Sequence, residues 1–135
     1  MAVTKPEIDG AVTEALVGAL GVGEDEVTKE ATVLGDLGAE SIDLLDILFR
    51  LERKLGVKIQ AADLAAHVQG GIADDEFGDA NGKITPKGLA QLKKVMPQID
   101  TNALAGKLEA EKVMSLFTVA NLSDMVAGKL AAKGA

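Results

Sequence analysis

Residues 41–55, SIDLLDILFRLERKL, have apolar side chains at helical spacing on two sides, and this stretch constrains the fold more than any other. At about 100° per residue, one face is a stripe made by Leu44, Ile47, Leu48, Leu51 and Leu55. Such a stripe predicts that other helices cover it. A smaller strip, on the same side as Ser41, consists of Ile42, Leu45 and Phe49. Burial in a helical bundle does not explain this second strip.

Capping residues indicate where further helices begin and end. Thr4 has the spacing of a capping box with Glu7, and Gly21 is a helix stop, so a helix is expected between them. Thr85, which precedes a proline, and Thr118 are the N-caps expected for two later helices. Together these signals predict an all-α fold.

Aromatic residues make up only 2% of the 135-residue chain, and Trp and Tyr are missing. The core is therefore built from aliphatic side chains, which favours a compact helical bundle, and the length fits one domain. We expect the bundle to bury Leu16, Leu44, Ile47, Leu48, Leu51, Leu55, Leu122 and Val126.

The formal net charge of −7 makes nucleic acid and anionic membranes poor partners and basic protein surfaces natural ones. The chain has no cysteine, so any thiol chemistry would need a cofactor. Its first residues lack the features of a signal peptide, and no apolar run approaches the ~20 residues that span a bilayer. We expect a cytoplasmic protein without a membrane span.

Residues 60–107 contain a short helical segment, an Asn81-Gly82 hairpin signal and the helix that Thr85 begins. The hairpin also fits a calcium-binding loop in part, with Asp79 at the third position. The first and twelfth positions are Phe77 and Gly88, so an EF-hand is rejected and no metal site is expected. Weak binding of a divalent ion by the acids at 74–79 is the alternative.

The sequence GVGEDEVTKEATVLGDLGAESIDLLDILFRLERKLGVKI resembles the middle of an acyl carrier protein, and EAEKVMSLFTVANLSDMV resembles its end. The resemblance covers residues 5–59 and 108–130. It implies a four-helix bundle without catalytic activity, in a single carrier domain over residues 1–135. Residues 60–107 would then be a helical and turn-rich insertion between the second and third helices.

In this family, a serine at the start of the second helix carries 4′-phosphopantetheine through a phosphodiester. The resemblance implies that Ser41 has this role and that an acyl group is carried as a thioester on the arm. A plain N-cap serine is the alternative from spacing alone. Glu40 stands where the family usually has Asp, which puts the choice of modifying transferase in question.

The resemblance also implies a docking patch on the helix that Ser41 begins. Acids at its start would face basic patches on partner enzymes, around an apolar centre; the predicted patch is Glu40, Ile42, Asp43, Leu45, Asp46 and Phe49. Acids are also favoured at any helix N-terminus, and Phe49 could instead cover the inserted segment. The second half of this helix is basic, with Arg50, Arg53 and Lys54, where family members are often acidic.

The implied partners are a phosphopantetheinyl transferase and an acyl-ACP synthase, ketoacyl synthase or acyltransferase. We expect a monomeric acyl carrier of lipid or fatty-acid biosynthesis, with specialised lipid or lipid A pathways included. A polyketide or aminoacyl carrier and an unmodified acidic docking module are the alternatives. The insertion would enlarge the acyl pocket or form a partner-selective surface.

Overall fold

The structure is a computed structural model that describes residues 4–132. In this part of the chain the regular elements are helices, and β-structure is limited to isolated bridges. In order, they are α1 (Lys5–Leu20), η1 (Glu24–Glu26), α2 (Ser41–Leu55), α3 (Ala61–Gln69), α4 (Asp74–Phe77), α5 (Pro86–Val95), α6 (Thr101–Leu104), η2 (Ala110–Leu116) and α7 (Val119–Ala132). The predicted all-α fold is confirmed.

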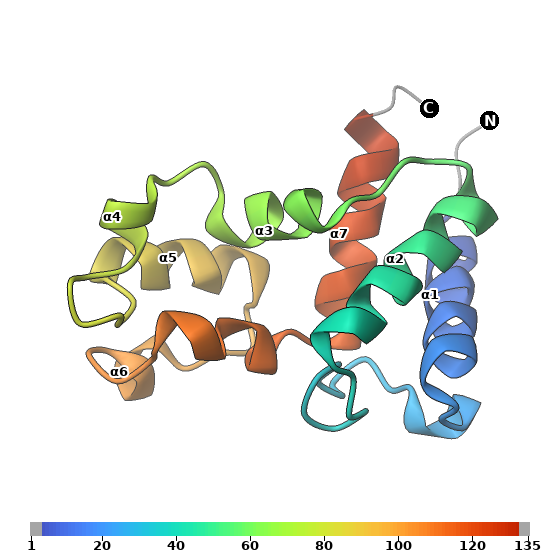
Figure 1. The fold of residues 1–135 in the computed structure, drawn as a ribbon, viewed down its shortest axis with the longest axis horizontal. Coiled ribbons are helices and arrows are strands. Elements are labelled where there is room, and N and C mark those ends of the chain that lie inside the picture. Colours follow the sequence, from blue (N-terminus) through green and yellow to red (C-terminus); the bar gives the residue numbers. More distant parts are fainter. Residues whose placement is uncertain (1–3, 133–135) are drawn as a thin grey trace.

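Helices α1, α2 and α7 form a bundle in which α1 packs against both of the others (Figure 1). The side chains at its centre are fully buried and include Leu16, Ile47, Leu51, Leu122 and Val126. Leu48 is also buried, as predicted. The prediction was wrong for Leu44 and Leu55, which are only half-buried because they lie in the terminal turns of α2, where fewer neighbours cover them.

The predicted helix ends agree with the structure. The amide N–H of Glu7 donates to the Thr4 hydroxyl over 3.4 Å, which is one half of the predicted capping box. Gly21 closes α1 with φ 70°, a left-handed conformation that favours glycine. Thr85 caps α5 in the same way as Thr4 caps α1, by accepting from the N–H of Gly88 over 3.0 Å.

The connection from α1 to α2, residues 21–40, is fastened to the bundle through both side chains and backbone. Val33 and Leu37 are buried in the core. The N–H of Val33 donates to the carbonyl of Phe117 over 2.9 Å, and the N–H of Ala39 donates to the carbonyl of Val33 over 3.1 Å. These bonds fix the chain that leads into Ser41.

Residues 60–107, called the middle segment below, lie to one side of the bundle, next to α7, and α3 of this segment also contacts α2 (Figure 1). Helix α5 packs against α3, α4 and α6. Apolar residues from these helices and from the connections between them continue the core into the segment; they are Leu64, Val68, Phe77, Ile84, Leu89, Leu92, Met96 and Ile99. The middle segment is thus a packed helical body and not a loose loop.

The predicted turn at Asn81-Gly82 is present, with Gly82 at φ 78°, but its flanks pair only through a single bridge between Gly78 and Ile84. One carboxylate oxygen of Asp79 accepts from the backbone N–H of Asn81 over 2.9 Å and of Lys83 over 3.0 Å. Among residues 4–132, no cluster of His, Asp or Glu is arranged to hold a metal ion. The turn is stabilised by the hydrogen bonds that the Asp79 carboxylate accepts within it.

Asn121, on α7, joins the bundle to the middle segment and is only 2% exposed. Its amide nitrogen donates to the carbonyl of Val95 over 3.0 Å. Its amide oxygen accepts from the side chain of Gln98 over 2.8 Å and from the N–H of Thr118 over 2.9 Å. One side chain therefore caps its own helix and ties it to the end of α5.

A second connection joins α3 to α7. Lys129 pairs with Asp63 over 2.9 Å, and this bond, with the N–H of Gln60, lowers the pKa of the Asp63 carboxyl. His67 also lies on α3, and its Nε2 is buried and has no hydrogen-bond partner. Burial lowers the pKa of His67, against the smaller opposing effect of Asp124 on α7. Together with the bonds of Asn121, the pair of Lys129 and Asp63 ties the middle segment to α7.

Candidate functional site

Ser41 is the first residue of α2, directly after the anchored connection. Glu40, the N-cap, has an extended backbone with φ −103° and ψ 170°, and its N–H donates to the Asp43 carboxylate over 2.8 Å. The first N–H groups of a 15-residue helix and its positive dipole end lie here, where a phosphodiester is favoured. The position therefore fits a phosphate-linked group, although Asp43 adds a negative charge nearby.

The chain has two other serines, and neither begins a helix. Ser123 lies within α7 and is only 2% exposed. Ser115 is exposed, but it lies near the end of η2 and its hydroxyl donates to the carbonyl of Lys112 over 2.6 Å. Neither serine therefore has the position of Ser41 at the N-terminus of a helix.

The apolar strip beside Ser41 is open to solvent. Ile42 is 71% exposed, Leu45 56% and Phe49 55%, and these are the exposed large hydrophobic side chains of residues 4–132. Phe49 is 55% exposed, which counts against the alternative in which this side chain covers the middle segment. An exposed apolar strip of this kind indicates a contact surface.

The charges on α2 change sign along the helix, and several are paired. Asp46 and Arg50 form an ion pair of 3.1 Å within the helix. The guanidinium of Arg53 lies 5.7 Å from the centre of the Phe49 ring, at cation–π distance. Asp43 and Asp46 therefore lie toward the Ser41 end of α2, and the second half carries Arg50, Arg53 and Lys54 together with Glu52. The i, i+4 spacing of Phe49 and Arg53 was the sequence signal for this contact, and sequence reasoning missed it.

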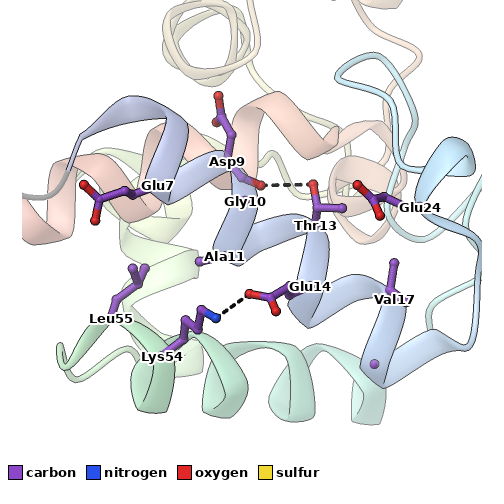
Figure 2. A pocket seen from close by; sticks show the side chains of 11 residues that line it. Glu7, Asp9, Gly10, Ala11, Thr13, Glu14, Val17, Glu24, Lys54 and Leu55 are labelled. Atoms are coloured by element: carbon purple, nitrogen blue, oxygen red, sulfur yellow. Dashed lines mark hydrogen bonds and ion pairs between the residues drawn. The ribbon is translucent and has the colours of Figure 1, made fainter.

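A large groove lies at the other end of α2, between α1 and α2 (Figure 2). Its volume is about 780 Å³, and acids from α1 and η1 line it together with Lys54, which pairs with Glu14 over 2.5 Å. Leu55, which also lines it, is about 21 Å along the helix axis from Ser41 at ~1.5 Å per residue. This groove is therefore separate from the Ser41 site.

Comparisons with known proteins show which family the chain is similar to. The family model described as "Phosphopantetheine attachment site" matches residues 10–69, which contain α2 and run through α3. The chain is 43% identical over 61 residues to the acyl carrier protein of Thermotoga maritima, covering 45% of this chain and 75% of that protein. It is 41% identical over 61 residues to that of Petrotoga mobilis, covering 45% and 72%. No solved structure matches the chain.

A third relative, the acyl carrier protein of Chloroherpeton thalassium, is 31% identical over 71 residues, covering 51% of this chain and 89% of that protein. The fold and these matches define a phosphopantetheine-carrying protein. The chain belongs to the acyl carrier protein family. The predictions of a non-catalytic carrier, of its cofactor and of modification by a phosphopantetheinyl transferase are confirmed by this membership. Within residues 4–132, every helix is too short or too polar to cross a bilayer.

Proposed function

We propose that Ser41 is the attachment residue for 4′-phosphopantetheine and that the loaded protein carries an acyl group between enzymes of lipid or fatty-acid biosynthesis. The observation that carries this proposal is the position of Ser41, at the first residue of α2 inside the family match. When bound, the arm supplies a flexible thiol that forms a thioester with the cargo. The chain itself supplies the helix N-terminus that favours the phosphodiester.

We also propose a single carrier domain over residues 1–135, with its core at 5–59 and 108–130 and the insertion at roughly 60–107. The resemblance at both ends of the chain supports this division, and so does the packed middle segment beside α7. The proposal includes a cytoplasmic, monomeric protein. Cell fractionation tests the cytoplasmic location, and sedimentation of the purified chain tests the monomeric state.

Modification of Ser41 is tested by the intact mass after incubation with coenzyme A and a broad-specificity phosphopantetheinyl transferase. Wild type should gain one phosphopantetheinyl group, Ser41→Ala should gain none, and Ser115→Ala should gain one. Ser115 is the matched control because it is an exposed serine elsewhere in the chain. A gain in Ser41→Ala, or no gain in folded wild type with any transferase tried, would refute the assignment.

The docking patch on α2 is the second part of the proposal. Glu40, Asp43 and Asp46 would meet basic groups of a transferase, synthase or acyltransferase, and Ile42, Leu45 and Phe49 would enter an apolar depression between them. Replacing Leu45 and Phe49 with serine should slow modification of Ser41 without loss of stability, since both side chains are exposed. Serine at Ala62 and Ala66, exposed positions on α3, is the control.

A docking module without a cofactor is the competing function. The exposed strip on α2 alone is compatible with it. It predicts that Ser41→Ala leaves partner binding and pathway flux intact, whereas the carrier function predicts loss of flux with partner binding retained. A polyketide or aminoacyl cargo would leave Ser41 in the same role and would appear as a different mass on the arm.

A further inference from the structure

A second groove lies where the middle segment meets the connection that leads to Ser41. Its volume is about 280 Å³. The apolar part of its lining comes mainly from the middle segment, with Ile99, Ala103 and Leu104, and is completed by Leu116 at the end of η2. Thr32, from the connection, lies on the other side. The groove is therefore built jointly by the middle segment and the bundle.

Backbone bonds place this groove within a bounded distance of Ser41. The N–H of Ala39 donates to the carbonyl of Val33 over 3.1 Å, Ser41 is two residues beyond Ala39, and Thr32 directly precedes Val33. Adding standard backbone dimensions along this path separates the Cα atoms of Ser41 and Thr32 by at most about 19 Å.

The arm that Ser41 would carry is long enough to cover this distance. About fourteen atoms follow the serine oxygen up to the thiol sulfur, and the Cα–Cβ and Cβ–Oγ bonds of the serine bring the path to about sixteen bonds. An extended polypeptide gains ~1.1–1.2 Å per bond, so the path from the serine Cα to the sulfur spans roughly 18–19 Å. The thiol can therefore reach the near end of the groove, and the cargo joined to it extends beyond that point.

The lining indicates the chemical class of the occupant. The apolar residues suit a hydrocarbon chain. Glu30 and Asp100 also line the groove, and two carboxylates disfavour a free fatty acid or a phosphate but not a neutral thioester. A methylene is about as large as a water molecule, at ~30 Å³, so the groove holds roughly nine of them.

We propose that this groove shelters the acyl chain of the carrier's own thioester: a chain of up to about nine carbons, or the first part of a longer one. The inference rests on attachment at Ser41. The centre of the bundle is a poorer location because Leu16, Ile47 and Leu51 fill it at 0% exposure. A chain entering there would have to displace packed side chains, whereas the groove is already open.

The first test uses the full chain in three forms: unmodified, carrying phosphopantetheine, and carrying octanoyl-phosphopantetheine transferred from octanoyl-coenzyme A. Methyl NMR signals of Ile99, Leu104 and Leu116 should shift in the octanoyl form and remain in place in the form that carries the arm alone. Shifts confined to Leu48, Leu51 and other bundle methyls would overturn the proposal, and so would an absence of shifts in any methyl group.

The second test blocks the groove. Ala103→Phe fills it from an exposed position, and Ala66→Phe, at an exposed position on α3, is the matched control. Hydroxylamine should cleave the octanoyl thioester about tenfold faster in Ala103→Phe than in wild type, because the sheltered fraction is lost. Ala66→Phe should cleave at the wild-type rate. Equal rates in all three proteins would refute the inference.

These outcomes are separable from the fate of the proposed function. If Ser41 gains no phosphopantetheine by mass, the attachment assignment has failed. If Ser41 is loaded with octanoyl-phosphopantetheine and the groove signals do not move, attachment stands and the groove proposal alone is wrong. Amide spectra of both phenylalanine variants show that they remain folded.

Discussion

Replacing Asn121 with alanine should destabilise the whole chain and loosen the middle segment from the bundle. The side chain is buried and bonded to α5, to Gln98 and to the first turn of its own helix. Alanine keeps the helix but removes every one of these bonds. The N–H of Thr118 and the carbonyl of Val95 then lose their side-chain partner.

The expected cost follows from those two groups. An unsatisfied buried backbone group costs about 1–3 kcal/mol. Thr118 is 5% exposed and cannot recover its bond from water, whereas Val95 is half-buried at the end of α5 and can recover part of it. We expect a total loss of about 3 kcal/mol. Gln98→Ala, at an exposed position, should cost less than about 1 kcal/mol.

Urea unfolding followed by circular dichroism measures this loss. With a slope of about 2 kcal/mol per molar urea, the midpoint should fall by roughly 1.5 M in Asn121→Ala. Hydrogen exchange should show faster exchange at Met96, whose N–H bonds to Leu92, with little change at Leu51 in α2. A loss below about 1 kcal/mol, or equal acceleration in both regions, would refute Asn121 as the joint.

Three further predictions concern the middle segment. In Lys129→Met, the pKa of the Asp63 carboxyl should rise toward its ordinary value, as a carbon-13 NMR titration will measure. In the wild-type chain the folded-state pKa of Asp63 is lowered. The stability from this pair is therefore present at neutral pH and is lost as acid protonates Asp63. His67 has a lowered pKa in the folded state, so the unfolded chain binds more protons below about pH 6.5. The free energy of unfolding should therefore fall between pH 7.5 and 5.5, and by less in His67→Leu, as urea titrations at both pH values will measure. Gly88→Ala should cost about 2 kcal/mol in urea unfolding, because the new Cβ would lie 2.6 Å from the carbonyl oxygen of Phe77.

Local signals allowed much of the helical structure to be predicted from the sequence. The capping residues Thr4 and Thr85 and the stop at Gly21 act through bonds or conformations within a few residues, so a short window contains them. The apolar stripe of α2 identified its buried face for the same reason. It failed at Leu44 and Leu55 because burial at a helix end depends on what lies beyond the helix.

The hairpin shows where local reasoning stops. Asn81-Gly82 does turn the chain, but the N–H of Ile84 donates to the carbonyl of Leu108 over 2.8 Å, and the N–H of Ala110 donates to the carbonyl of Gly82 over 2.8 Å. The flank that follows the turn is therefore bonded to a distant segment as well as to residues 77–79. The turn is encoded locally, whereas its partner is a result of the tertiary fold.

Around the functional site, too, some features could be predicted from local spacing and others depend on long-range contacts. The position of Ser41 at a helix start and the strip of Ile42, Leu45 and Phe49 were readable from spacing. The bonds of Asn121 to Val95 and Gln98 were not, because they join residues separated by more than twenty positions in the chain. The groove beside Ala103 needs the same long-range packing and could not be predicted from any one stretch.

The bonds between α7 and the middle segment bear on how such a carrier can be recombined with others. Excising residues 60–107 would leave Asn121 without Val95 and Gln98, and Lys129 without Asp63. A chimera that grafts the middle segment onto another carrier would need an asparagine and a lysine at these two positions of that carrier's final helix. The transferable module is therefore the middle segment together with α7, and hybrid carriers should exchange the two as one piece.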